Sequence, residues 1–187
     1  DNDYMAMLAN KGINVIKDGY KERAIDRIVS SRNLLRKYAI DNRYDYLLMI
    51  EQDVIPPSDI IERLLMHRHK IVSGVYFTQA IIEGKKEIVP LLYKEHDESA
   101  GKMRYFTDDE INSNKLEEAR TAGLGCILIH IDILKKIEFR FVEGQAAFDD
   151  VWFANDIREL GQKIYADTSI KCRHLLLNRP WNWSQLK

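Results

Sequence analysis

Two acidic residues, Glu51 and Asp53, lie one position apart and directly follow an apolar run from Tyr46 to Ile50. Such a run is typical of a buried central strand, and Pro56-Pro57 ends the segment after the acids. Because side chains alternate along an extended chain, we expect both carboxylates to point the same way. Convergent carboxylates attract a hard cation, and Mg²⁺ or Mn²⁺ shares its remaining coordination with substrate phosphates. The triplet therefore predicts a metal and diphosphate site, with a solvated acidic loop as the alternative interpretation.

The elements around this triplet alternate between strands and helices. Apolar residues spaced by three and four predict a helix from Ile25 to Ala39, and Ser58-Asp59 offers a cap for a second helix from Ile60. Strands are expected over 46–50, 71–77, 123–129 and 163–166, and helices over 131–137 and 151–160. The charged segment 83–120 is expected to be a mobile excursion with one strand at 89–93. The alternation predicts one α/β domain over 1–187, with three layers and the chemistry at the carboxyl ends of the strands.

The bulk composition excludes several classes of protein. Lysine and arginine total 28 against 29 acidic residues, so no net field attracts nucleic acid or an anionic membrane. Cys126 and Cys172 lie in apolar or β-branched runs, which indicates buried thiols rather than disulfides or a metal cluster. No apolar run approaches the roughly 20 residues that a membrane helix needs. We expect a cytoplasmic protein without a transmembrane segment, which meets a membrane only peripherally or through a partner.

Four landmarks resemble the GT-A glycosyltransferases of the family 2 kind. They are Ser31-Arg-Asn-Leu-Leu35 with the strand that ends in Glu51-Gln-Asp53, the glycine-led stretch Gly123–Ile129, Phe148-Asp-Asp-Val-Trp-Phe153, and Gly161-Gln-Lys-Ile-Tyr165. In the family these positions hold an Ala-Arg-Asn helix, an Asp-x-Asp strand end, a strand beside the acceptor pocket, and a Glu-Asp helix followed by Gly-x-Lys-Ile. The landmarks keep the family's order and cover about Ile25 to His174. The resemblance implies the GT-A fold, a three-layer α/β/α sandwich on a mixed, mostly parallel sheet.

The resemblance also implies a donor site around the acidic triplet. Asp53 matches the aspartate that ligates the metal, and Glu51 matches the acid that faces the ribose or the metal, although the family has aspartate there. Gln52, between the two acids, falls in the same donor-binding group. Arg32 matches an arginine near the nucleotide base or diphosphate. Asn33 is assigned to the donor site, with packing or turn stabilisation as its alternative role.

His174 completes the metal set that the resemblance implies. It ends the strand-like run Thr168–His174, in the position where many metal-dependent members keep a histidine for the metal or the diphosphate. Its imidazole would join Asp53 and Glu51 around Mn²⁺ or Mg²⁺. The alternative is a structural histidine, which is the more common role of a lone histidine.

Asp149 and Asp150 are the expected catalytic pair. Asp150 matches the aspartate that, in inverting members of the family, removes the proton from the acceptor hydroxyl, and Asp149 replaces the family's glutamate. Burial beside a second acid would raise the basicity of such a carboxylate. The alternative is that these acids cap a helix whose amino terminus favours negative charge, which applies more strongly to Asp149.

The expected acceptor side consists of small and aromatic residues. Gly125 and Cys126 belong to the strand that resembles the one beside the family's acceptor pocket. Trp152 and Trp181 are candidates for stacking on a sugar, because an indole face packs well on the apolar face of a pyranose. Core packing is the alternative for Trp152.

These expectations describe an inverting, metal-dependent glycosyltransferase that moves a sugar from a nucleotide diphosphate to an acceptor hydroxyl. A UDP-sugar is the favoured donor, with GDP- and dTDP-sugars as alternatives, and the acceptor is a glycan, a lipid-linked group or a protein. A metal-dependent nucleotidyltransferase is one rival, although the sequence lacks the glycine-rich phosphate loop that it would need. The other rival is a non-catalytic carbohydrate-binding domain on a GT-A frame. It gains weight because residues 1–11 contain no convincing apolar first strand.

Overall fold

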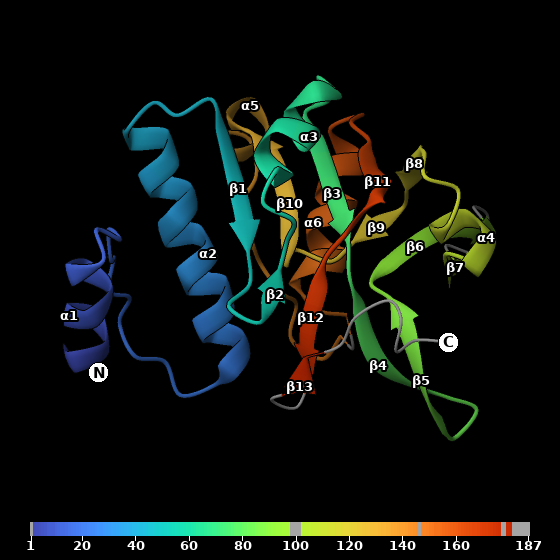
Figure 1. The fold of residues 1–187 in the computed structure, drawn as a ribbon, viewed down its shortest axis with the longest axis horizontal. Helices are drawn as coiled ribbons and strands as arrows, with labels where there is room; N and C mark the ends of the chain where they lie inside the picture. Colours follow the sequence, from blue (N-terminus) through green and yellow to red (C-terminus); the bar gives the residue numbers. More distant parts are fainter. Residues whose placement is uncertain (1, 98–101, 146, 177–178, 181–187) are drawn as a thin grey trace.

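A five-stranded sheet forms the centre of the molecule in a computed structural model that describes residues 2–97, 102–145, 147–176 and 179–180 (Figure 1). The strands lie in the order β1 (Tyr46–Ile50), β10 (Cys126–His130), β3 (Ile71–Val75), β11 (Ile164–Lys171) and β8 (Leu116–Ala119). β1 and β10 are almost wholly apolar in sequence, which suits strands that are covered on both faces. The strand predicted after the first long helix is therefore confirmed at its predicted bounds.

The strand directions bring several chain segments to one edge of this sheet. β1 and β3 are both antiparallel to β10, and β11 is parallel to β3. β1, β3 and β11 therefore run the same way, and their carboxyl ends meet at the lower edge of the sheet in Figure 1. Glu51 follows β1 at this edge, Tyr76 follows β3, and His174 lies in β12 (Arg173–Leu176), which follows β11.

Two apolar cores lie on the two faces of the sheet, because successive residues of a strand point to opposite sides. Ile127 points into the larger core, which is closed by α2 (Ala24–Asp41), α5 (Ile131–Leu134) and α6 (Asp149–Glu159). The next residue, Leu128, points into the smaller core. Among the described elements, the helix that contributes to this smaller core is the seven-residue α3 (Ile60–Met66), through Ile60 and Leu64.

The predicted three-layer α/β/α sandwich of GT-A type on a mostly parallel sheet is wrong. Three of the four pairings in the central sheet are antiparallel, and one short helix covers the second face instead of a helical layer. The physical reason lies in the connections. β1 and β3 are joined through α3 as the alternation predicts, but β10 then enters between them from a series of hairpins rather than from a helical crossover.

The segment 83–120, expected to be a mobile excursion, is built of short elements instead. They are β5 (Lys85–Pro90), which pairs with β4 (Phe77–Ile82), then β6 (Leu92–Asp97), β7 (Lys102–Tyr105), α4 (Asp108–Ile111) and β8. Glu83 and Gly84 join β4 to β5 with φ of 49° and 78°. Positive φ at both positions matches a tight hairpin turn, which glycine favours. Glu83-Gly84 was therefore a sequence signal for a hairpin, which the surrounding charged residues made easy to overlook.

The remaining elements are short or peripheral. They are α1 (Asn2–Asn10), β2 (Val54–Ile55), β9 (Thr121–Ala122) and β13 (Arg179–Pro180), and β2 pairs with β12 in a small separate sheet. Within the described residues, no helix is both long enough and apolar enough to cross a membrane.

Asn33 ties α2 to the loop that follows α5. Its side-chain amide donates a hydrogen bond to the Phe139 carbonyl at 2.8 Å, and its carbonyl oxygen accepts one from the Phe139 N–H at 2.9 Å. The Phe139 ring is buried and stacks on Phe153 of α6. Both ends of the amide are therefore used to hold backbone, which is the structural role that was the alternative for this residue.

We expect Asn33→Ala to lower the free energy of unfolding by about 1–3 kcal/mol, because it leaves two partly buried backbone groups of Phe139 without partners. Urea unfolding followed by circular dichroism measures this change. Asn42→Ala is the matched control, because exposed Asn42 makes one bond to the Tyr38 carbonyl. A control that loses as much stability as Asn33→Ala would contradict the assigned role.

Candidate functional site

A buried arginine organises the carboxyl edge of the sheet. Arg32 lies in the middle of α2 and is 10% exposed. One guanidinium nitrogen donates to Asp149 Oδ2 at 2.7 Å, and the other donates to Glu51 Oε1 at 2.6 Å. Three elements far apart in sequence, α2, the end of β1 and the start of α6, are thereby joined by one side chain. Arg32, predicted to bind the donor, thus has two carboxylates as its direct partners.

Burial shifts the acid–base properties of these carboxyls. It raises the pKa of Glu51 above its ordinary value, the Arg32 cation lowers it, and the charges of Asp53 and Asp149 raise it further. Burial also raises the pKa of Asp149, again against the opposing effect of Arg32. Glu51 is 41% exposed and Asp149 only 7%, so water screens the charge of Glu51 more than that of Asp149.

Tyr76 lies at the centre of this edge, although the sequence analysis did not select it. The buried phenol oxygen accepts a hydrogen bond from the Gly125 N–H at 2.8 Å, and the ring packs edge-on against His174. Burial raises the pKa of Tyr76 well above its ordinary value, and the charges of Glu51 and Asp150 add to the shift. The hydroxyl therefore stays neutral and keeps a proton to donate. The sequence predicted a strand over 71–77, so Tyr76 lay inside the expected strand, whereas β3 ends at Val75.

Gly125 is required by close approach rather than by backbone conformation. A Cβ at this position would lie 2.7 Å from both Glu51 Oε2 and the Tyr76 hydroxyl oxygen. The Gly125 carbonyl also accepts a hydrogen bond from the Glu51 N–H at 3.0 Å. Gly125, predicted on the acceptor side, thus lies against Glu51 and Tyr76 and leaves no room for another side chain.

Asp53 and His174 form a pair of possible metal ligands. Asp53 Oδ2 lies 3.3 Å from His174 Nε2, and the Asp53 carbonyl accepts the Leu175 N–H at 2.7 Å. His174 is buried, and its Nδ1 lies 2.5 Å from the Phe77 carbonyl oxygen. A carbonyl can only accept, so Nδ1 carries a proton, and Nε2 is the ring nitrogen that faces Asp53. Metal-binding histidines commonly show this arrangement, with the second ring nitrogen donating to a backbone carbonyl.

The two adjacent aspartates have different surroundings. Asp149 is the partner of Arg32, whereas Asp150 Oδ1 accepts the Val151 N–H at 2.8 Å. No ion pair of Asp150 with a lysine or arginine is found in the described part of the chain. Burial raises the pKa of Asp150, the Val151 N–H lowers it, and the charge of Asp149 raises it. Asp150 therefore has a raised pKa and, unlike Asp149, makes no direct hydrogen bond to Arg32.

Several predicted site residues lie elsewhere. Cys126 is fully buried and its thiol interacts with that of Cys172 in the smaller core, so its expected acceptor contact is not supported. The Trp152 ring packs against the Arg140 guanidinium, whose central carbon lies 4.9 Å from the ring centroid. Gln52 is exposed in the turn after β1. Asn33 holds Phe139, as described above, and Trp181 lies outside the described residues.

The acidic edge offers few protein ligands to a metal. Among the described residues, no group of three or more histidine, cysteine, aspartate or glutamate side chains is arranged to hold an ion. The close pair is Asp53 and His174, because Glu51 is turned toward Arg32. Two protein ligands suit Mg²⁺ or Mn²⁺ only where substrate oxygens supply further ligands.

We expect Arg32→Gln to lower the free energy of unfolding by about 2–3 kcal/mol near pH 7, because two carboxylates lose their buried cation. The deficit should shrink as the pH falls toward about 5, because the pKa of Glu51 and of Asp149 would rise further in the folded variant. A carboxyl with a raised folded-state pKa gains stability as pH falls. Urea unfolding at a series of pH values measures the trend.

Arg36→Gln is the control for this pH series. Arg36 lies on the same helix and is 15% exposed, but its bonds go to the Leu134 carbonyl and to the exposed Glu138. The loss in free energy of unfolding caused by Arg36→Gln should be nearly independent of pH over the same interval. An Arg32→Gln deficit that stayed constant or widened on acidification would show that the cation does not control these carboxyls.

Comparison with known proteins finds a similarity of fold and no match in sequence. No protein-family model matches the chain, and no curated protein matches it. The chain is similar to the crystal structure of A197 from STIV, with a TM-score of 0.53 and 18% sequence identity. The alignment covers 93% of this chain and 78% of A197. At this identity the similarity shows a shared fold and nothing about function.

Proposed function

We propose that the protein is a metal-dependent glycosyltransferase that moves a sugar from a nucleotide diphosphate to an acceptor hydroxyl. The observation that carries the proposal is the convergence of Glu51, Asp53, Asp149 and His174 with Arg32 at the carboxyl edge of the sheet. These residues come from three of the segments that resemble family 2 glycosyltransferases and from the strand-like run that ends in His174. The resemblance is in sequence motifs, and it supports the activity without the GT-A sandwich.

Asp53 and His174 would hold Mn²⁺ or Mg²⁺. Asp53 Oδ2 and His174 Nε2 face each other at 3.3 Å, and with the Nδ1-protonated neutral ring both atoms can give an electron pair to one cation. The Phe77 carbonyl fixes the ring and its tautomer. The metal would stabilise the negative charge that develops on the leaving diphosphate. A UDP-sugar is the donor that we favour.

Arg32 serves this site indirectly. Its guanidinium fixes Glu51 and Asp149 through hydrogen bonds of 2.6 and 2.7 Å and is itself almost buried. It therefore neutralises part of a strongly acidic cluster and sets the orientation of α6 relative to β1. With Asp149 committed to Arg32, Asp150 is the acid that would accept the proton of the acceptor hydroxyl, and burial favours that role by raising its pKa.

The metal pair is tested by binding of UDP in the presence of Mn²⁺. We expect Asp53→Asn to abolish Mn²⁺-dependent UDP affinity, because the change keeps the volume but removes the charge. His174→Ala should weaken that affinity by roughly tenfold to a hundredfold, because one neutral contact is lost near the metal. Isothermal titration calorimetry with and without Mn²⁺ measures both.

His69→Ala is the control for the histidine. His69 stacks on Tyr165, with ring centroids 4.0 Å apart, so the substitution removes an imidazole without touching Asp53. Unchanged Mn²⁺-dependent UDP affinity in Asp53→Asn would refute the metal pair. A chain that binds free sugars but no nucleotide would instead support the carbohydrate-binding rival.

Asp150→Asn tests the proposed general base. We expect it to lower kcat by about a hundredfold to ten-thousandfold and to leave donor affinity nearly unchanged, because the base acts only in the transition state. The asparagine can still accept the Val151 N–H, so the start of α6 is preserved. Transfer of radiolabelled sugar from the donor measures kcat.

Asp149→Asn separates the two aspartates. It should chiefly lower stability, because Arg32 loses a buried partner. If Asp149→Asn abolished turnover in a folded protein while Asp150→Asn remained active, the base would be assigned to the wrong residue. Full activity in both variants would exclude either aspartate as the base.

A further inference from the structure

Three turns meet at the edge of the central sheet that lies opposite the proposed transfer site. They are residues 42–45 after α2, residues 67–70 after α3, and residues 135–136 after α5. The Ile131 N–H donates a hydrogen bond to the Asp45 carbonyl at 2.9 Å, and the His130 N–H donates one to the Lys70 carbonyl at 2.7 Å. In Figure 1, α5 and the turns after α2 and α3 lie along the upper edge of the sheet. These three turns therefore form one surface, which we call the basic edge.

Exposed cations without ion pairs gather on the basic edge. Within the described part of the chain, four of its cations form no ion pair: Arg43, Arg68, Lys135 and Lys136. Lys70 is compensated, because its Nζ lies 3.7 Å from Asp132 Oδ2 of α5. Asp45 is the one acid in the sequence of the three turns. The basic edge therefore has a local positive excess, although the whole chain has a net charge of −1.

Both arginines of the basic edge have a backbone conformation that favours glycine. Arg43 is the second residue after α2 and Arg68 the second after α3, and their φ angles are 59° and 53°. In this left-handed region a side chain crowds the backbone, and helices usually place glycine at this position.

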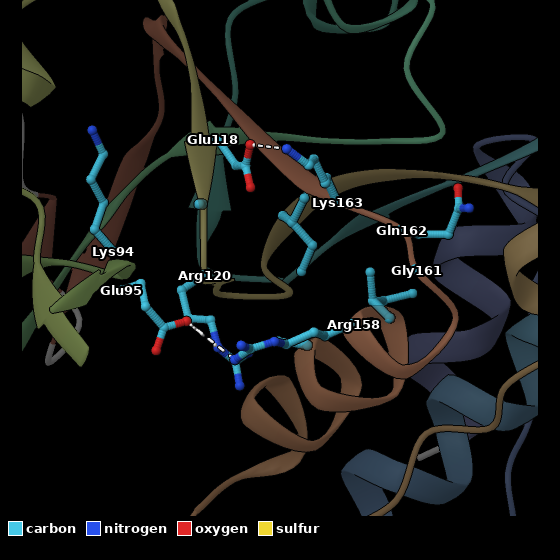
Figure 2. Close-up of a pocket in the computed structure, with 12 residues that line it drawn as sticks. Lys94, Glu95, Glu118, Arg120, Arg158, Gly161, Gln162 and Lys163 are labelled. Atoms are coloured by element: carbon cyan, nitrogen blue, oxygen red, sulfur yellow. Dashed lines mark hydrogen bonds and ion pairs between the residues drawn. The ribbon is translucent and has the colours of Figure 1, made fainter. Parts of the chain in front are cut away.

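α6 ends at the same edge of the sheet and has the usual residue there. The second residue after α6 is Gly161, with φ of 65°. Figure 2 shows Gly161 in this turn, and it shows the nearby Lys163 paired with Glu118, at 2.7 Å. Glycine thus ends a helix at this edge without strain. The comparison indicates that Arg43 and Arg68 are present for their side chains, because their backbone positions would be less strained with glycine.

Exposed apolar side chains lie beside these cations. Leu65 and Met66 end α3 just before the basic turn and are 40% and 78% exposed, and Tyr44, next to Arg43, is 52% exposed. Cations beside exposed apolar groups match the interface of an anionic bilayer, where phosphates attract the cations and apolar groups enter the acyl boundary. A nucleic acid would contact the cations but would offer Leu65 and Met66 no apolar phase. The combination therefore favours a lipid surface.

We infer that the basic edge binds the surface of an anionic lipid membrane. Arg43, Arg68 and the lysines after α5 contact lipid phosphates, and Met66 inserts between the headgroups. The carboxyl edge of the sheet then faces away from the bilayer, so the proposed transfer site stays open to water. Binding depends on the local excess of cations, because the net charge of the chain would not attract it to an anionic surface.

Co-sedimentation of the whole chain with lipid vesicles tests the partner. The probes are vesicles of phosphatidylcholine alone and vesicles of phosphatidylcholine mixed with phosphatidylserine. We expect binding to the mixed vesicles to be at least about tenfold tighter and to weaken as salt is added, because each cation near an anionic surface contributes about fivefold. Equal binding to both kinds of vesicle, or no binding to either, overturns the proposal. Equally tight binding of a single-stranded oligonucleotide would assign the basic edge to nucleic acid instead.

Arg43→Gly and Arg68→Gly test the two arginines through effects of opposite sign. Each should weaken binding to the mixed vesicles by about fivefold, because one surface cation is lost. Neither should lower the urea midpoint of unfolding, because glycine adopts positive φ without strain. A purely structural role would give the reverse result, a lower midpoint with unchanged vesicle binding, and would overturn the proposal. Met66→Ser should also weaken binding, and an unchanged affinity would contradict insertion of this side chain.

Two control variants lie away from the basic edge. Asn114→Gly places glycine at another positive φ, of 54°, without changing the charge. Lys86→Gln removes an exposed cation from β5. Both should leave vesicle binding unchanged, and a loss equal to that of the arginine variants would show that the basic edge has no special role. Asp53→Asn should also leave vesicle binding unchanged, so the result is independent of the proposed transfer activity.

Discussion

The ion pairs of Arg32 with Glu51 and Asp149 determine how the functional edge is assembled. A guanidinium in the middle of a helix is buried only where anions compensate for its lost hydration, and here the two anions come from the end of β1 and the start of α6. Without the cation, the negative charges of Glu51 and Asp149 would repel each other. The position of α6, and with it that of Asp150, is therefore coupled to the strand that presents Asp53.

The direction of the strands matters more for this edge than the overall parallel or antiparallel character of the sheet. Because β1, β3 and β11 run the same way, the residues that follow them are neighbours even though β10 separates β1 from β3 in the opposite direction. Gly125 shows what this interleaving requires. The chain entering β10 passes directly against Glu51 and Tyr76, so a glycine is needed where an ordinary strand would tolerate a side chain.

Local signals in the sequence were sufficient to predict the elements near the acidic triplet, but they were insufficient to predict the order and direction of the strands in the sheet. The apolar run before Glu51 and the periodicity of α2 predicted a strand and a helix that the structure contains. The order of strands was not predictable, because it depends on the pairing of β10 with β1 and β3, which are distant in sequence. Partners of individual residues were equally hidden: nothing near Arg32 or Asn33 indicates that their contacts are Asp149 and Phe139, more than a hundred residues away. Tyr76 was missed because the apolar run predicted a strand over 71–77, within which an aromatic residue is usually part of the core.

The short pairing between β2 and β12 determines how firmly Asp53 and His174 are held together. Val54 pairs with His174 and Ile55 with Arg173 in a sheet separate from the central one, and the Leu175 N–H closes the ladder on the Asp53 carbonyl. So small a ladder can open by local fluctuation while the central sheet stays folded. Opening it would part Asp53 from His174, and any ion that bridges them would hold it closed. Binding of the proposed metal to this pair would therefore stabilise the pairing of β2 with β12, and that pairing would in turn favour binding.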